Sequence, residues 1–423
     1  MERCQFGSVI FTRDRFLGQF KRHLCVEETL FQNMESNIDN YYDMNKRFLS
    51  FVGQWPYQKP KEKTSFLILI VITVINAMIT QMAQFFICEN AQCIYQTLPP
   101  YMLAIMILVK VLTFYFNKQK IKELTDRLFT NWNILENQEE REIMKKYAET
   151  GKWYGLIYTS YIYIGFVLFT IFALMPRILD NVFPMNTSRS VLLVYPAYYF
   201  VDQEQYFYYI FCHMIVTVAI ALTGILAHDC MLYAYIEHAC GLFAVIGFRF
   251  KHTLYKYNNV EKMMINHHDI YCKNIVFAVH VHREALKFAI LLENTFSLSF
   301  AIQMLIVTVG MSISLVQFSI QLHNFAEAMR YLLFIGAQLF HLFCYSFEGQ
   351  KLINHSLETC DKIYNGSWYK IPASTQKLLL MVMRKSIESS TLTAGKIYIF
   401  SLESFTTVLQ TSMSYFTVLS NFN

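Results

Sequence analysis

Long apolar blocks, each with few or no charges, dominate the sequence from residue 66 to the C-terminus. A bilayer core of about 30 Å requires about 20 consecutive apolar residues in an α-helix, so blocks of this length can cross a membrane. The predicted spans are Phe66–Ile87, Leu98–Phe116, Trp153–Pro176, Phe207–Ala227, a fifth within Asn294–Leu322, the shorter Tyr331–Phe347, and a seventh from about Leu392 to Phe422. The pattern predicts an all-α integral membrane protein with seven transmembrane helices.

The composition supports this class. Of the 423 residues, 54% are hydrophobic and 16% are charged, whereas soluble domains carry roughly 25% charged residues. The first apolar block begins too late for a cleaved signal peptide, so we expect the first span to act as its own insertion signal. No basic run is interleaved with aromatic residues, so nucleic acid is not an expected partner.

Lysine and arginine residues concentrate in alternate connections between the spans. The rich connections are 1–64 with ten, 117–152 with eight, 228–293 with seven and 348–391 with six, and the poor ones are 88–97 with none, 177–206 with two and 323–330 with one. Positive residues stay on the cytoplasmic side, so we expect the N-terminus inside and the C-terminus outside. This direction is opposite to that of a G-protein-coupled receptor.

Two of the inner connections have helical periodicity. Ile275, Val279, Leu286 and Ile290 recur at helical spacing before span five. The stretch Gln376–Ser390 contains an apolar run that is too short to cross a bilayer. Both are predicted to be helices with one apolar face, which either pack into a cytoplasmic bundle or lie on the membrane surface.

The cysteines and histidines predict no metal site. The ten cysteines are scattered, and Cys88 and Cys93 flank a predicted outer loop as either a disulfide or two free thiols. His280 and Glu284 stand four residues apart, but no third ligand follows at a fixed spacing. With no nucleophile elbow, phosphate-binding loop or paired carboxylates in a span, we expect no cofactor and no enzymatic activity.

The last apolar block carries a narrow stripe on one helical face. The stripe consists of Glu403, Thr407, Thr411, Ser414, Val418 and Asn421. Inside a bilayer such a stripe faces water or other helices. A pore would require a ring of several copies, in which Val418 closes the channel by dewetting, Asn421 forms a polar mouth and Glu403 concentrates cations. Alternatively, the Thr and Ser side chains join packed membrane helices.

The C-terminus also carries a motif. Ser414-Tyr415, five residues, then Asn421-Phe422 resembles the Thr-Tyr, five residues, Gln-Phe signature of the insect chemoreceptor superfamily. The two departures fit its odorant-receptor branch better than the gustatory branch. Stretches similar to odorant receptors of ants and bees are Leu49–Gln58, Phe200–Asp202, Trp368–Pro372 and Gln376–Leu380.

The resemblance, which covers the whole chain, implies a function. Such receptors are tetrameric, ligand-gated, non-selective cation channels in the plasma membrane of olfactory sensory neurons. They usually combine an odour-tuned subunit, which binds a small volatile organic molecule, with a shared co-receptor subunit. The resemblance implies that Val418 is the hydrophobic gate, that Asn421 faces the conduit, and that the inner ends of spans four to seven form a cytoplasmic anchor between subunits.

This chain lacks the long insertion between spans four and five that is typical of the co-receptor, so it resembles a tuning subunit. The alternatives are a gustatory-type channel acting as a homotetramer and a secondary transporter, although the inverted repeats and broken helices of transporters are not visible. The expected division is a cytoplasmic segment 1–65, spans one to six with the odorant site in 66–347, an anchor-helix region 348–391 and a pore helix 392–423.

Ligand sites in the family lie in the outer half of the bundle, between spans two, three, four and six. The residues expected to contact the odorant are Tyr101, Ile105, Met106, Phe169, Thr170, Tyr208, Phe211, Phe334 and Gln338. A pocket of aromatic side chains and methionine with a few polar groups suits a small apolar volatile, which would bind mainly by burial at about 25 cal/mol per Å².

Overall fold

In lipid the backbone has no water to bond, so long apolar blocks fold into helices whose N–H and C=O groups pair internally. The computed structural model describes residues 40–135, 137–182, 193–259 and 268–421. The chain forms two units, Met1–Met44 and Asn45–Asn423. In the first unit only residues 40–44 are described, and they are helical.

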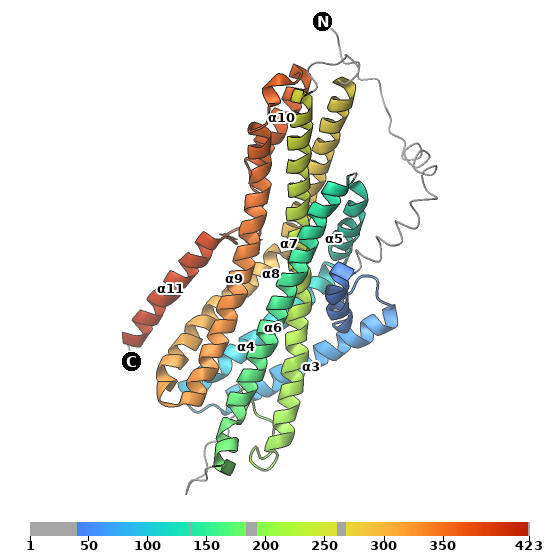
Figure 1. Ribbon diagram of the computed structural model, residues 1–423. Helices are drawn as coiled ribbons and strands as arrows, with labels where there is room; N and C mark the ends of the chain where they lie inside the picture. Colours follow the sequence, from blue (N-terminus) through green and yellow to red (C-terminus); the bar gives the residue numbers. More distant parts are fainter. Residues whose placement is uncertain (1–39, 136, 183–192, 260–267, 422–423) are drawn as a thin grey trace. The chain divides into compact units, whose positions relative to one another are not determined.

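The second unit is almost entirely helical (Figure 1). Its longer helices are α3 (Pro60–Ile87), α4 (Ala91–Phe116), α5 (Lys118–Thr130), α6 (Gln138–Val182), α7 (Phe207–Asn259), α8 (His268–Ile320), α9 (Phe325–Tyr364), α10 (Ala373–Ser386) and α11 (Leu402–Asn421). The short elements are the 3-10 helices η1 (Asn131–Ile134), η3 (Gln321–His323) and η4 (Trp368–Lys370), and the strands β1 (Thr393–Ala394) and β2 (Tyr398–Ile399).

Six helices of the described chain, α3, α4 and α6 to α9, are long and apolar enough to cross a membrane. They contain the first six predicted spans, and we take the membrane-spanning segments to be those charge-poor runs. The helix α11 has 20 residues, which is about 30 Å at 1.5 Å per residue and matches a bilayer core. It is not counted among the six apolar helices, because the polar residues on one of its faces lower its overall hydropathy. The predicted all-α, multi-span fold is confirmed.

The long helices extend well beyond any membrane. Both α7 and α8 have 53 residues, so each is about 80 Å long, against a hydrocarbon core of about 30 Å. Their ends, with the end of α9, lie beside α10 (Figure 1). The prediction that the helix before span five begins well outside the membrane is therefore confirmed.

The helix α7 lies at the centre of the second unit and packs against α6, α8 and α9. Every residue from 224 to 243 is buried. A helix that is enclosed on all sides needs apolar residues all round. The polar side chains in this stretch therefore need specific partners, because an unpaired polar group is costly to bury.

The predicted apolar face of α8 was displaced by part of a turn. Ile275 is buried, but Ile290 is 56% exposed. The buried positions instead include Ala278, Ala285 and Ala289. Val281, Phe288 and Leu292 are buried as well, so the face that packs on the neighbouring helices is set by the rotation of α8 and not by side-chain size.

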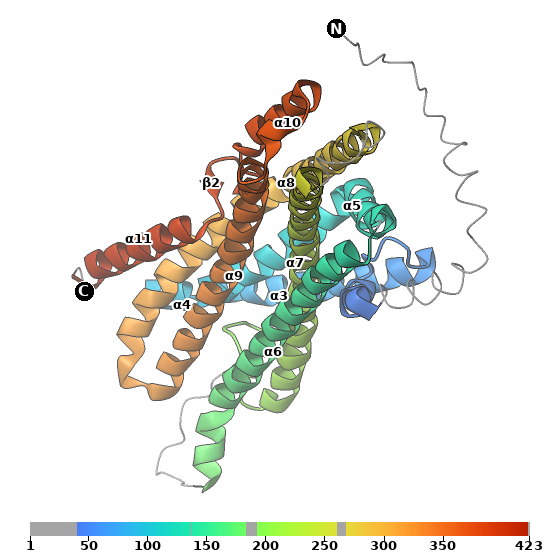
Figure 2. The same ribbon diagram turned by 45° about the horizontal axis from the view of Figure 1, so that its top comes forward.

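The seventh span begins later than predicted. Residues 392–401 do not continue the helix, because β1 and β2 form a short antiparallel hairpin in which Thr393 pairs with Ile399. Gly395 and Lys396, with φ of 63° and 62°, form its left-handed turn, a conformation that glycine adopts at no steric cost. Figure 2 shows the hairpin at the base of α11, beside α9.

Candidate functional site

A cavity of about 600 Å³ lies between α4, α6, α7 and α9, and the segment 193–203 covers one side. Its wall is mainly aliphatic and aromatic, with Met106, Phe166 and Leu222 among the lining residues. This volume is within the range of about 300–1,000 Å³ of small-molecule sites, and such sites combine an apolar wall with a few polar groups.

Four of the residues predicted to contact the odorant line this cavity. They are Met106, Phe169, Phe334 and Gln338. They come from α4, α6 and α9, three of the spans that were expected to surround the site. Ile225 from α7 also lines it, so all four expected helices contribute to the wall.

The other five predicted contact residues do not line the cavity. Tyr101 packs edge-on against Phe85 with ring centroids 5.5 Å apart, and Ile105 is half-buried on another face of α4. The Thr170 hydroxyl donates to the carbonyl of Phe166 at 2.9 Å. The remaining two lie on α7: Tyr208 is 66% exposed and Phe211 is buried in an apolar cluster.

Sequence reasoning missed a buried arginine at the wall of the cavity. Arg330 lines the cavity and is 8% exposed. Its Nη2 donates to the carbonyls of Leu193 and Val194 at 3.0 and 2.8 Å, and Glu327 lies 3.5 Å from Nη1. The guanidinium also lies over the ring of Phe169 at 5.0 Å. Arg330 therefore fixes the covering segment to α9.

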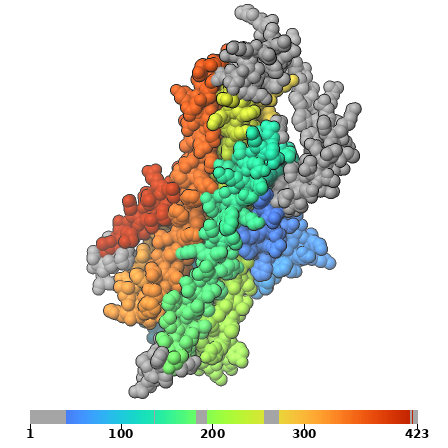
Figure 3. Space-filling view, in the orientation of Figure 1, coloured from blue at the N-terminus to red at the C-terminus, as the bar shows by residue number. Residues whose placement is uncertain are grey.

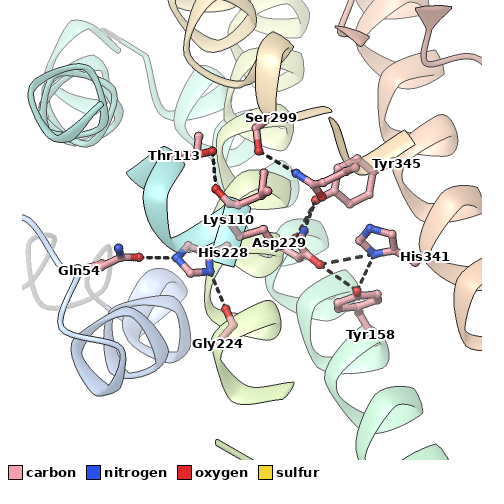
Figure 4. A network of polar contacts seen from close by, with 12 residues as sticks. Gln54, Lys110, Thr113, Tyr158, Gly224, His228, Asp229, Ser299, His341 and Tyr345 are labelled. Carbon is pink, nitrogen blue, oxygen red and sulfur yellow. Dashed lines mark hydrogen bonds and ion pairs between the residues drawn. The ribbon is translucent and has the colours of Figure 1, made fainter. Parts of the chain in front are cut away.

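A buried ion pair between Lys110 on α4 and Asp229 on α7 lies near the cavity (Figure 4). The Asp229 carboxylate also accepts hydrogen bonds from Tyr345 at 2.6 Å and Tyr158 at 2.9 Å, and His341 Nδ1 lies 2.8 Å from the Tyr158 oxygen. These groups, which we call the charge network, join α4, α6, α7 and α9. Two of them, Tyr158 and His341, also line the cavity.

Burying the charge network costs free energy unless every charged and polar group in it has a partner. Removing two charges from water costs several kcal/mol per ion, and only close pairing with further hydrogen bonds offsets that cost. Ionisable groups within a membrane span are functional candidates for this reason. Lys110 was not singled out from the sequence, although an ionisable residue inside a predicted span is a signal that could have pointed to this site.

The end of the unit near α10 has its own buried polar groups, outside the membrane-spanning segments. Glu237 on α7 pairs with Lys351 on α9. His282 Nε2 lies 3.2 Å from the Ser386 hydroxyl of α10. Burial, and to a lesser extent the charge of Lys385, lowers the pKa of His282 to about 4. These contacts tie α7, α8, α9 and α10 together into a bundle.

The predicted stripe on α11 is exposed as far as it is described. Glu403, Thr407, Thr411 and Ser414 are all exposed, and α11 stands out from the neighbouring helices (Figure 3). The two threonines and the serine donate back to carbonyls of their own helix at 2.8–3.1 Å. The side chains of Val418 and Asn421 lie outside the described part of the structure.

The opposite face of α11 turns towards α8 and α9. Phe405 contacts Phe343 of α9 with ring centroids 5.7 Å apart, and Ser412 is buried. The base of α11 is fixed by Phe400, whose ring lies 5.7 Å from that of Tyr345 in the charge network and 5.2 Å from that of Phe300. The hairpin before it is held by Glu293, which accepts from the Thr393 backbone N–H at 2.8 Å.

Cys88 and Cys93, which the sequence left open, are joined by a disulfide. It closes the connection between α3 and α4, where the Asn90 side chain caps α4 by accepting from Cys93 N–H at 2.9 Å. Among the described residues no group of three or more His, Cys, Asp or Glu side chains is arranged to hold a metal ion.

The stretch Leu49–Gln58, which carried part of the family resemblance, has a structural role. Leu49, Val52 and Trp55 are buried. Gln54 donates to the Val111 carbonyl at 2.8 Å and bonds His228 of α7. This segment therefore anchors the chain before α3 against the centre of the bundle.

Comparison with known proteins agrees with this arrangement. The model of the family described as 7tm Odorant receptor matches residues 90–413. Odorant receptor 22c of Drosophila melanogaster is 34% identical over 96 residues, which cover 23% of this chain and 24% of that protein. Odorant receptor Or2 of Anopheles gambiae is 27% identical over 114 residues, which cover 26% and 29%. The matches therefore span only about a quarter of these relatives.

The fold resembles that of a solved insect olfactory receptor. OR5 from Machilis hrabei in complex with eugenol gives a TM-score of 0.76 at 13% identity, over 92% of this chain and 99% of that one. A second structure of OR5 from Machilis hrabei gives a TM-score of 0.71 at 14% identity. At these identities the likeness shows the shared fold.

The family model covers most of the chain, and the relatives are insect receptors rather than enzymes. With six apolar helices that can span a bilayer, the chain is a multi-pass protein of the plasma membrane, as predicted. The chain belongs to the 7tm Odorant receptor family.

Proposed function

We propose that this chain is the odorant-binding subunit of a ligand-gated, non-selective cation channel and that the cavity between α4, α6, α7 and α9 binds a small volatile molecule. The observation that carries the proposal is the cavity itself, whose apolar wall and few polar groups fit such a ligand. The related OR5 structure contains eugenol, a ligand of that general kind.

The second part of the proposal concerns the pore. The stripe of α11 is exposed in the single chain, while its other face packs on α8 and α9. A ring of four subunits would turn these stripes towards a common axis, with Val418 as the gate, Asn421 at the mouth and Glu403 below. One wall would come from this chain, and a co-receptor subunit would supply the rest.

The third part is the orientation. The described parts of three Lys/Arg-rich connections, 117–152, 228–293 and 348–391, lie at the α10 end of the long helices (Figure 1). The described parts of the poor connections lie at the other end, where Cys88 and Cys93 form the disulfide. The positive-inside rule then places the α10 bundle in the cytoplasm, as an anchor between subunits. The cavity lies in the outer half.

Opening requires a ligand that binds the open arrangement more tightly than the closed one, because equal affinity shifts no equilibrium. Whole-cell recording tests the proposal in cells that express this chain with and without an odorant co-receptor. We expect odour-evoked cation current only with the co-receptor, and we expect it to persist when G-protein signalling is blocked. Current from this chain alone would instead support a homotetrameric, gustatory-type channel. Absence of current across a broad volatile panel, with surface expression confirmed, would refute the channel.

A further inference from the structure

One ring nitrogen of His341, a residue of the cavity wall, has no hydrogen bond within the described part of the structure. We propose that Nε2 of His341 is a hydrogen-bond acceptor that selects volatile ligands bearing a hydroxyl group. The inference deepens the proposed function and rests on it, because it names the chemical class of ligand for the same cavity. It follows from which atoms of the charge network carry a hydrogen and which accept a hydrogen bond.

The assignment of donors and acceptors starts from the carboxylate of Asp229. This carboxylate is paired with Lys110, and an ionised carboxylate only accepts hydrogen bonds. The Tyr158 hydroxyl lies 2.9 Å from Asp229 Oδ2, so the single proton of that hydroxyl is directed at the carboxylate. Tyr158 then has only lone pairs for its second neighbour.

That second neighbour is His341, whose Nδ1 lies 2.8 Å from the Tyr158 oxygen and 3.5 Å from Asp229 Oδ2. Both of these oxygens are acceptors at that position, so Nδ1 carries the hydrogen. In a neutral imidazole the other nitrogen, Nε2, is then an acceptor. The tautomer is therefore set by the buried ion pair.

The ring is held where a ligand can reach it. His341 lines the cavity and is only 8% exposed, and no hydrogen bond to Nε2 occurs among the described residues (Figure 4). One turn earlier on α9, Gln338 also lines the cavity, and its enclosed Oε1 has no partner. Two acceptors one turn apart on α9 thus lie in a cavity wall that is mainly apolar.

A ligand hydroxyl satisfies this site, whereas an ether or a carbonyl brings a second acceptor to it. The ring is fixed by Tyr158 and by packing against Tyr345, with ring centroids 4.6 Å apart, so little side-chain freedom is lost on binding. One added hydrogen bond should lower the dissociation constant roughly tenfold, which corresponds to about 1.4 kcal/mol.

The test uses matched sets of probes: straight-chain primary alcohols, their methyl ethers and the aldehydes of the same chain length. Binding to the purified protein is measured by ligand-induced thermal stabilisation, and channel opening is measured by current with the co-receptor. We expect the alcohol to act at a roughly tenfold lower concentration than its ether or aldehyde. In His341→Phe we expect this ratio, measured by thermal stabilisation, to fall to about one.

The ratio between alcohol and ether is insensitive to expression or general destabilisation. The matched control is His323→Phe, at an exposed histidine in η3, which should leave the ratio unchanged. Binding of all three classes without a preference, a preference for the aldehyde, or an unchanged ratio in His341→Phe would overturn the inference and leave the proposed ligand cavity standing. If no probe class binds at all, both the inference and the proposed cavity fail.

Discussion

Replacing Asp229 by asparagine leaves the ammonium group of Lys110 buried and without a counter-ion. The two side chains are 3% and 1% exposed, so water cannot compensate. Among the described residues, the Tyr345 hydroxyl, 2.9 Å from Lys110 Nζ, would be the remaining hydrogen-bond partner of the ammonium group besides the new amide. Breaking a buried pair in this way costs about 3–5 kcal/mol, and we expect Asp229→Asn and Lys110→Met each to destabilise the protein by that amount.

The double variant, Asp229→Asn with Lys110→Met, measures how much each charge depends on the other. With both charges removed no buried charge is left uncompensated, so the cost should be well below the sum of the two single costs, because apolar replacement of a whole ion pair is often neutral. The assay is thermal unfolding of the detergent-purified protein, supported by surface expression in cells. The two single variants should unfold several degrees lower, on the order expected for a few kcal/mol.

Additive costs in the double variant would refute the reasoning, because they would show that the charges do not depend on each other. The control is the exposed pair of Lys59 and Glu62 at the start of α3, 3.9 Å apart with side chains 83% and 54% exposed. The variants Lys59→Met and Glu62→Gln should each change stability by less than about 1 kcal/mol.

Three further predictions follow from other contacts. Arg330→Met removes the two hydrogen bonds to the covering segment and should weaken odorant binding several-fold and speed dissociation, measured by current decay after washout. Phe400→Ala removes the aromatic contacts at the base of α11 and should lower maximal current while thermal stabilisation by ligand persists. Burial holds the pKa of His282 at about 4, below the usual 6.5; the unfolded state binds the proton first, so stability should fall as pH drops from 6.5 towards 4, less steeply in His282→Asn.

Hydropathy alone located the six apolar spans, because the bilayer requires a run of apolar residues wherever a helix crosses it. It did not identify which face of each helix turns inward. Tyr208 and Phe211 both begin span four as aromatic residues, yet the first is 66% exposed and the second 3% exposed. That difference depends on the packing of α6 and the segment before α7, which periodicity within one helix does not contain.

The partners within the charge network could not be predicted from the sequence either. Lys110 is visible in the sequence as an ionisable residue within a span, but its partner Asp229 is 119 residues away and follows the end of the predicted fourth span. No local pattern joins the two. The hairpin at residues 393–399 was missed because an apolar run leading into a helix resembles more helix, and only Gly395 in its left-handed turn marks the interruption.

The position of the charge network bears on how a ligand would open the proposed channel. His341 lines the cavity, and Tyr345 lies one turn further along α9 on the same face, where its ring meets Phe400 at 5.7 Å, just before α11 begins. Interlocked buried partners favour discrete arrangements, because intermediate positions leave charges unpaired. A change in packing that a ligand causes at His341 would therefore be passed to the start of α11 through Tyr345 and Phe400. Tyr345→Phe keeps the ring and removes the hydrogen bond to Asp229, so we expect it to alter maximal current at saturating ligand. Substitutions in the apolar wall, such as Leu222→Ala, should alter only the concentration required. The same change in maximal current from both variants would contradict this route.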